Sequence, residues 1–228
     1  MNEFDLKQLN FIGENDSFSF GCTCCGACCR HREDILLSAY DLWRIAGYLH
    51  KSIEEIVDVY CRVYIGNSSH LPVVNIEPKG MHATCPFLIR NKCTIHIVKP
   101  QVCAIFPLGR ISTEDTGETK YFLQSIDCGD KTQTYTLKKW LAKSGITEDS
   151  HECLSHWRKL LNSLFEVAKI INDFSDTGKK ACYNAIFSAM YLGYVIEKPF
   201  LPQIKERQKT MADLSKKLCE MAKYRTDS

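Results

Sequence analysis

The residues with the clearest capacity for chemistry lie between positions 21 and 30, where five of ten residues are cysteines. Four of them, Cys22, Cys25, Cys28 and Cys29, follow the spacing C-x2-C-x2-C-C. A C-x2-C pair directs two thiolates from one tight loop toward one ion, as in zinc sites and iron–sulfur proteins. Cys28 and Cys29 are adjacent and point apart along an extended backbone. We therefore expect them to bind different metal atoms, in a polynuclear cluster or in two centres.

More cysteines occur between residues 85 and 128: turn-prone Pro86, Asn91-Lys92 and Pro100 separate Cys85, Cys93 and Cys103, and Gly129 follows Cys128. Those neighbours favour turns and interrupt regular helices, so we expect these thiols on loops or at a helix start. Joined with the first segment, they complete the set of metal ligands predicted from the sequence: Cys22, Cys25, Cys28, Cys29, Cys85, Cys93, Cys103 and Cys128. Cys24 lies outside the C-x2-C register and is either a bystander or a ligand of a second ion.

Other candidate ligands fit a structural role better. Cysteines that are isolated on helices usually pack as small hydrophobic residues, and this is our interpretation of four of them: Cys61, Cys153, Cys182 and Cys219. His31 and His96 could supply nitrogen ligands, although histidines near a metal loop more often form hydrogen bonds to the ligands.

The spacing of the cysteines also distinguishes between the two candidate metals, zinc and iron. A tetrahedral zinc site commonly combines two C-x2-C pairs, and the region after residue 85 supplies no second pair. A 4Fe–4S cluster also takes four thiolates and readily uses a C-x2-C-x2-C run with one remote cysteine. The sequence thus favours an iron–sulfur cluster, with zinc as the alternative.

Composition limits the function classes. The 228 residues carry a formal net charge of +2, which argues against a nucleic-acid-binding protein, and we expect no basic excess beside the cysteines. The first ten residues lack the pattern of a signal peptide, and no segment approaches the roughly 20 apolar residues of a membrane helix. We therefore expect a cytoplasmic protein, where clustered cysteines bind metal more often than they form disulfides.

Helical periodicity dominates the rest of the chain. Ser38 and Ser52 each precede an acidic residue by three positions, the spacing of a capping box, and predict helices over residues 38–49 and 52–64. A short strand is expected at 71–76 and a small hairpin from 110–112 and 120–125, with its turn at 115–117. Four further helices are predicted: 136–145, 147–174, 179–195 and 202–224.

The predicted fold is therefore mostly α with a small β-hairpin. We expect a lead segment at 1–20, a cysteine-rich, metal-centred N-terminal domain at 21–130 and a C-terminal helical extension at 131–228. The last helix carries apolar residues at heptad-like spacing, which predicts packing on the rest of the protein: Ile204, Met211, Leu214, Leu218 and Met221.

Several motifs together resemble a known family. The C-x2-C-x2-C-C run is followed by ILLSAYDLWRIAGYL from Ile35, by CPFL from Cys85, and by C-x-I-H-x2-K-P-x2-C-x2-F-P from Cys93. These motifs are similar to those of the YkgJ-like cysteine-cluster family, which has a zinc- or iron-chelating CxxCxxCC domain. The resemblance covers residues 21–130.

The resemblance also implies functions that the spacing alone does not. The family is related to flagellin lysine N-methylases, which implies an iron–sulfur cluster, S-adenosylmethionine and a protein substrate. This chain departs from the family at Lys99 and Ala104, where arginines are usual, at His96, where tyrosine is common, and at Cys128-Gly129, which lacks a proline. Any anion binding by those arginines is therefore not carried over.

Two function classes remain. In the first, the protein is an iron–sulfur enzyme or redox protein, with methyl transfer as one option, that acts on a protein substrate or with a redox partner. In the second, it is a zinc-binding structural or interaction module without catalysis. Neither class calls for nucleic acid or a membrane.

Overall fold

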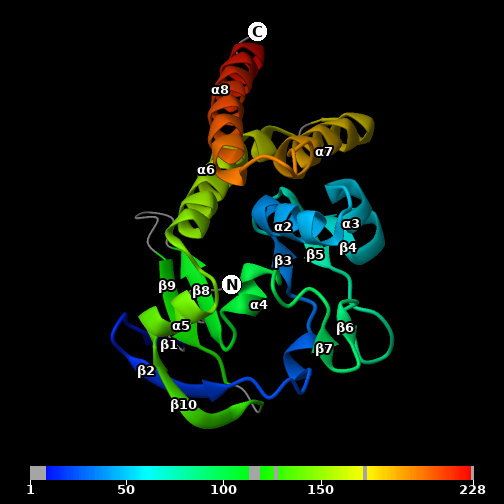
Figure 1. Cartoon of the computed structure of the whole chain (residues 1–228). Coiled ribbons are helices and arrows are strands. Elements are labelled where there is room, and N and C mark those ends of the chain that lie inside the picture. Colours follow the sequence, from blue (N-terminus) through cyan, green and yellow to red (C-terminus); the bar gives the residue numbers. More distant parts are fainter. Residues whose placement is uncertain (1–8, 113–118, 126–127, 172–173, 227–228) are drawn as a thin grey trace. The chain divides into compact units, whose positions relative to one another are not determined.

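The computed structural model describes residues 9–112, 119–125, 128–171 and 174–226 (Figure 1). The chain forms two compact units, and each is built from two separate segments. The first unit comprises Met1–Ile35 and Pro78–Glu148, and the second comprises Leu36–Glu77 and Asp149–Ser228. The predicted division of the chain at residues 20 and 130 stays a prediction.

The fold class predicted from the sequence is wrong. Of the residues that the structure describes, 48% are helical and 21% are in strands, which form four small sheets. The protein is therefore mixed α/β and not mostly α with one hairpin. The additional strands have only two to seven residues, and most pair with strands far away in the sequence. Such strands carry little local periodicity, and their pairing depends on tertiary context.

The first unit contains a three-stranded antiparallel sheet in the order β1-β9-β8 and a two-stranded ribbon of β2 and β10 (Figure 1). The predicted hairpin is confirmed as β8 and β9, whereas its predicted turn lies outside the described residues. The strands of this unit are β1 (Asn10–Ile12), β2 (Ser17–Gly21), β6 (Leu88–Ile89), β7 (Lys92–Cys93), β8 (Leu108–Ser112), β9 (Thr119–Leu123) and β10 (Asp130–Thr136).

An aromatic core holds the first unit together. Trp140, on α5 (Leu137–Lys143), meets the rings of Phe18 and Phe20 edge-on at centroid separations of 5.7 and 5.6 Å. Its indole N–H donates a 2.8 Å hydrogen bond to the carbonyl of Ile105, which follows the short helix α4 (Gln101–Ala104). This core therefore fixes the end of β2 and the end of α4, the two places where cysteine-bearing segments begin or end.

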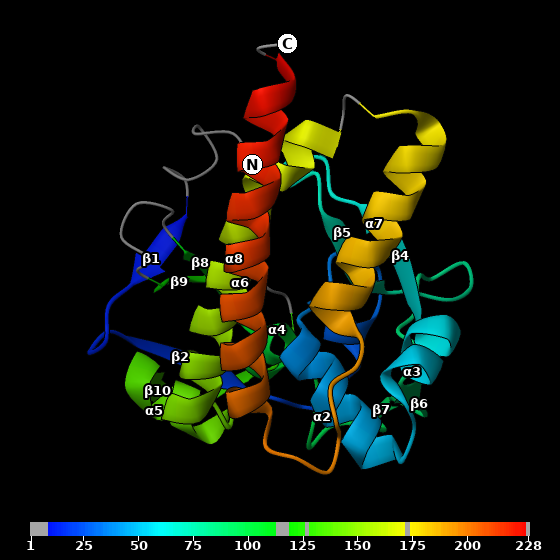
Figure 2. The same cartoon turned by 90° about the horizontal axis from the view of Figure 1, so that it is seen from above.

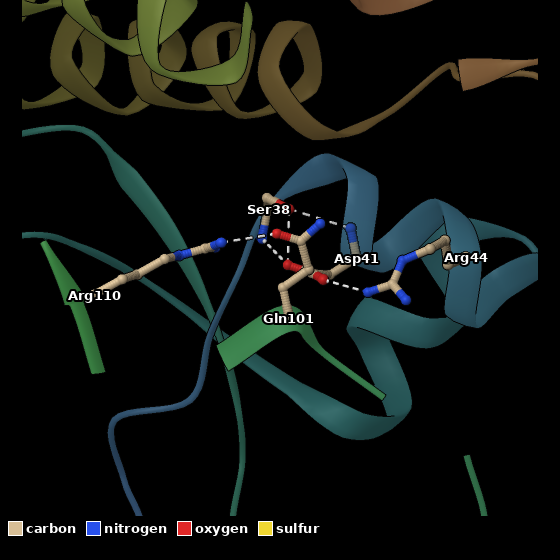
Figure 3. Close-up of polar contacts among 5 residues, drawn as sticks. All are labelled: Ser38, Asp41, Arg44, Gln101 and Arg110. Atoms are coloured by element: carbon tan, nitrogen blue, oxygen red, sulfur yellow. Dashed lines mark hydrogen bonds and ion pairs between the residues drawn. The ribbon is translucent and has the colours of Figure 1, made fainter. Parts of the chain in front are cut away.

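The second unit contains the sheet β3-β5-β4, with β3 at Leu36–Leu37, β4 at Cys61–Ile65 and β5 at Pro72–Ile76. Both predicted capping boxes are confirmed, at α2 (Ala39–Leu49) and α3 (Ile53–Tyr60). In the first, the buried Asp41 carboxylate accepts bonds from the Ser38 N–H and hydroxyl and pairs with Arg44 at 2.7 Å (Figure 3).

Helix α3 ends four residues earlier than predicted. Cys61 caps its C-terminus and begins β4, whose β-branched and aromatic residues pair with β5. The predicted burial of Cys61 is confirmed, but its predicted position inside a helix is wrong.

Three long helices complete the second unit: α6 (Glu148–Ile171), α7 (Asp176–Tyr191) and α8 (Phe200–Thr226). Helices α6 and α8 lie side by side (Figure 2), where the Ser215 hydroxyl bonds to the Ser163 carbonyl and His156 contacts Gln208 at 3.2 Å. No helix in the described part of the chain is long and apolar enough to cross a membrane.

The predicted apolar stripe on α8 packs along only part of its length. Ile204 and Met211 are buried, whereas Leu214 and Leu218 are 46% and 40% exposed. The side chain of Met221 lies outside the described residues. The packing prediction is thus correct for the first half of the stripe and wrong for Leu214 and Leu218.

Candidate metal centre

The first cysteine segment is a tight loop that leads into a single turn of 3-10 helix, η1 (Ala27–Cys29). Gly26 begins the turn with φ of 72°, as expected for a glycine inside the second C-x2-C pair. A Cβ at this position would lie 2.6 Å from Nη1 of Arg30, so a larger residue would require that guanidinium to shift.

Arg30 joins this loop to a small hairpin formed by β6 and β7. Its guanidinium donates to the carbonyl of Cys25 at 3.1 Å and to Oδ1 of Asn91 at 2.5 Å. Asn91 and Arg90 form the two-residue hairpin turn, with φ of 61° and 49°, as a type I′ turn requires. Cys93 ends β7, so one arginine connects the two cysteine-bearing segments.

Backbone hydrogen bonds also hold the two cysteine-bearing segments together. The amide of Cys85 donates to the carbonyl of Cys29 at 2.8 Å, and the amide of His31 donates to the carbonyl of His82 at 3.1 Å. The His31 and His82 rings meet edge-on, 5.9 Å apart. Residues separated by more than 50 positions in the sequence are therefore held side by side.

Cys22 and Cys128 lie at one end of the β2–β10 ribbon. Gly21 pairs with Asp130, so Cys22 leaves the ribbon where the chain from Cys128 enters it. Gly129 follows Cys128 and has a φ of 80°. A Cβ at this position would lie 2.8 Å from the carbonyl oxygen of Gly21. Close contact of the two chain segments therefore depends on this glycine.

Cys103 lies on the four-residue helix α4, where a loop or a helix start was expected. Gln101, on the same helix, is buried, and its side-chain carbonyl accepts a 2.9 Å hydrogen bond from Arg110 of β8 (Figure 3). With Ile105 in the aromatic core, this bond fixes α4 against the sheet and sets the position of Cys103.

The thiols converge electrostatically on Cys28. Burial or hydrogen bonding is the largest cause of the pKa shift of each of the other seven thiols predicted as ligands, and a thiolate at Cys28 contributes an increase to every one: Cys22, Cys25, Cys29, Cys85, Cys93, Cys103 and Cys128. The pKa of Cys25 is nevertheless lowered, chiefly by the hydrogen bond from the Ala27 amide. Because such charge effects fall off with distance, the two sulfur-rich segments share one neighbourhood.

The sulfur atoms of Cys28 and Cys29 lie 3.9 Å apart, within η1. The expectation that these two side chains point apart along an extended backbone is therefore wrong, because both residues belong to a 3-10 turn. The Cys29 thiol donates a hydrogen bond to the Cys28 thiolate, which lowers the pKa of Cys28 to about 6, and Lys99 and Arg32 lower it further against the effect of burial. The same hydrogen bond, together with burial, raises the pKa of Cys29.

The distal thiols are held in their protonated form by burial. Burial is the largest cause of the raised pKa values of Cys85, Cys93 and Cys103, with further increases from neighbouring thiolates. It also raises the pKa of Cys128 to about 11. Clustered, partly buried thiols repel one another as thiolates, and a metal cation removes that penalty by binding them.

Comparison with known proteins supports this interpretation. A family model described as "CxxCxxCC: Putative zinc- or iron-chelating domain" matches residues 21–139, slightly more than half of the chain. The chain belongs to this CxxCxxCC family. The match begins one residue before Cys22 and ends in α5, so it includes the entire cysteine-rich part of the first unit.

One curated relative of the CxxCxxCC domain is the uncharacterized protein MJ0661 of Methanocaldococcus jannaschii. It is 29% identical over 103 residues, which are 44% of this chain and 51% of the relative. The chain thus spans about half the length of this relative. No solved structure matches the chain.

The residues present fit a thiophilic metal by chemistry but are not arranged as a closed ligand shell. Thiolates are the preferred donors of zinc and of iron–sulfur clusters. Nevertheless, no group of three or more cysteine, histidine, aspartate or glutamate side chains among the described residues is placed to hold an ion. The backbone brings the thiols of the CxxCxxCC domain into one neighbourhood. Coordination of one ion by three or more of them would require their side chains to rotate closer together.

The two compact units divide the cysteines between them. The eight predicted ligands all belong to the first unit, whereas Cys61, Cys153 and Cys182 belong to the second. There is no disulfide among the cysteines that the structure describes. His96 is exposed, and its pKa is lowered chiefly by Lys99.

Sequence reasoning missed the residues that position the thiols. Arg30 was not singled out, although it follows the cysteine run directly and bonds to both segments. The Asn91 turn was recognised, but not the hairpin around it. Two-residue strands give no periodic signal, so only the turn residues could have indicated β6 and β7.

Proposed function

We propose that the first unit binds iron as a 4Fe–4S cluster through cysteine thiolates of the CxxCxxCC domain, with zinc as the alternative metal. The candidate ligands are Cys22, Cys25, Cys28, Cys29, Cys85, Cys93, Cys103 and Cys128. One observation carries the proposal: the two sulfur-rich segments are held side by side by the bond from the Cys85 amide to the Cys29 carbonyl and by the bonds of Arg30 to the Cys25 carbonyl and to Asn91.

The eight candidates exceed the four thiolates of a single zinc ion or cluster, which supports a second centre. Cys22, Cys25 and Cys128 form one subset: Cys22 and Cys128 lie at the same end of the β2–β10 ribbon, and after burial the thiolates of Cys25, Cys28 and Cys22 raise the pKa of Cys128. A second subset contains Cys29, Cys85, Cys93 and Cys103. Thiolates within this set raise the pKa of Cys29, Cys85 and Cys103, and the Cys85 amide bonds to the Cys29 carbonyl. Cys28 acts on both subsets.

Metal binding by these thiols would depend on pH. A bound metal takes thiolates and releases their protons, so the raised pKa values of Cys85, Cys93 and Cys103 become part of the cost of binding. Loading should therefore become stronger as pH rises.

Iron is favoured over zinc by spacing, since three cysteines stand in one C-x2-C-x2-C run and no distal candidate belongs to a second C-x2-C pair. A redox or methyl-transfer role would follow from a cluster with an open coordination position. S-adenosylmethionine binding rests on the family resemblance alone and stays a prediction, as does a cytoplasmic location, where reducing conditions would keep the thiols available.

The test is the composition of protein purified without oxygen from iron-replete cells. We expect brown protein that contains iron and acid-labile sulfide. Colourless protein with stoichiometric zinc and no iron would replace the cluster with the zinc module. Protein without either metal, after reconstitution with both, would reject metal binding by this domain.

A further inference from the structure

The near-neutral charge of the whole chain conceals a local excess. Residues 78–110 contain five lysines and arginines and no aspartate or glutamate: Lys79, Arg90, Lys92, Lys99 and Arg110. The expectation of no basic excess concerns the cysteine cluster at residues 21–30, which lies outside this segment. Arg110 is engaged with Gln101, whereas Arg90 and Lys92 are exposed at the tip of the β6–β7 hairpin.

Exposed apolar side chains accompany these charges. Met81 is 97% exposed, Ile97 81% and Ile89 57%, and they lie on the hairpin or on the turns on either side of it. Exposed methionine and isoleucine side chains cost solvation free energy and are characteristic of binding surfaces when they occur together. We call Met81, Ile89, Arg90, Lys92 and Ile97 the hairpin rim.

The hairpin rim is fixed in place before any partner arrives. Arg30 holds the turn through Asn91, and the Thr94 amide donates to the carbonyl of Phe87 at 2.9 Å across the base of the hairpin. The turn that bears Met81 is closed by the paired residues Lys79 and Thr84. A preorganised surface loses little conformational entropy on binding.

We propose that the hairpin rim binds an acidic, amphipathic segment of a partner protein. Arg90 and Lys92 would pair with carboxylates, and Met81, Ile89 and Ile97 would cover apolar side chains of the same segment. Arginine and methionine are enriched at protein interfaces, and opposite charges give such contacts their specificity.

A nucleic acid is the other polyanion that could bind a basic surface. Single strands are bound by exposed aromatic side chains on which the bases stack. Residues 78–110 contain two aromatic residues of the Phe, Tyr and Trp types: Phe87 is buried, and Phe106 packs against the aromatic core. The rim offers aliphatic side chains in their place, which favours a protein.

The experiment is fluorescence anisotropy of labelled probes with the full chain at low salt. The probes are a peptide of mixed glutamate and leucine, the same peptide with serine for leucine, and single-stranded DNA of equal charge. We expect the glutamate–leucine peptide to bind most tightly. Arg90→Gln combined with Lys92→Gln should weaken it by about tenfold, as should Met81→Ser combined with Ile97→Ser.

The matched control is Lys209→Gln with Lys216→Gln, which removes two exposed positive charges from α8 and should leave binding unchanged. Equal weakening by the control pair, no binding of the glutamate–leucine peptide, or DNA binding that is tighter and insensitive to the Met81 and Ile97 changes would overturn the proposal. Metal content is measured on every sample, so failure of the metal assignment is seen separately.

Discussion

The reactivity of Cys28 in the metal-depleted full chain tests the electrostatics of the centre. Its pKa of about 6 compares with an ordinary value of 9.0. At pH 7 about 90% of such a thiol is thiolate, against about 1% of an ordinary one. The Cys28 thiolate is, however, about 20-fold less nucleophilic toward a disulfide than the thiolate of an ordinary cysteine, because nucleophilicity falls with pKa with a Brønsted coefficient near 0.45.

These two effects predict a reversal with pH. Cys28 should react with dithiodipyridine about fourfold faster than an ordinary thiol at pH 7, and about tenfold slower at pH 9, where Cys28 is almost fully ionised and the ordinary thiol about half ionised. Its reaction rate should fall as pH drops through about 6, because protonation removes the nucleophile. Partial burial slows the reaction at every pH equally, so the pH midpoint is the quantity to compare.

The assay combines timed quenching with mass spectrometry of each cysteine-bearing peptide, and a short cysteine peptide serves as the reference thiol. Cys29→Ala removes the hydrogen bond that lowers the Cys28 pKa most, and should move the midpoint upward, whereas Cys29→Ser keeps a donor and should move it less. A midpoint near 9 in the unmodified chain, or one that Cys29→Ala leaves unchanged, would refute the role of the Cys29 thiol in lowering the Cys28 pKa.

Two further predictions concern the second unit. Asp41→Ala leaves the buried Ser38 N–H and Arg44 without their carboxylate and should lower the free energy of unfolding by about 2–4 kcal/mol, measured by urea denaturation; the exposed capping box at Glu55 provides the control, and Glu55→Ala should cost clearly less. Cys153→Ala should keep the full metal load and cost about 1 kcal/mol or less, so a loss of metal would bring this buried helical cysteine into the site.

Local signals explain which parts of the fold were predictable. The capping boxes at Ser38 and Ser52 involve residues three positions apart, and both are present. The four C-terminal helices follow the expected 3.6-residue period. By contrast, β2 pairs with β10 more than 100 residues away, and β1 pairs with β9. Nothing local in a three- or five-residue strand specifies such a partner.

The candidate site also has features that the local sequence predicts and features that it does not. The identity and spacing of the cysteines predicted a metal-binding domain, and the family match supports that. The spacing could not indicate that Arg30 would bond to Asn91, or that the Cys85 amide would bond to Cys29, because both contacts form between segments that are distant in the sequence. The local charge excess was hidden for a simpler reason: the acidic residues that balance it lie elsewhere in the chain.

A metal centre shared by the two sulfur-rich segments is tested most directly by the metal content of Cys85→Ser and Cys103→Ser, each purified without oxygen beside the unmodified chain. Loss of a thiolate ligand removes binding free energy that also supports the fold. We predict that both variants lose most of their metal and become protease-sensitive before residue 130, while Cys182→Ser keeps its metal. If Cys85→Ser and Cys103→Ser both retain the full load, the two sulfur-rich segments do not share a centre, and the proposed organisation of the domain is contradicted.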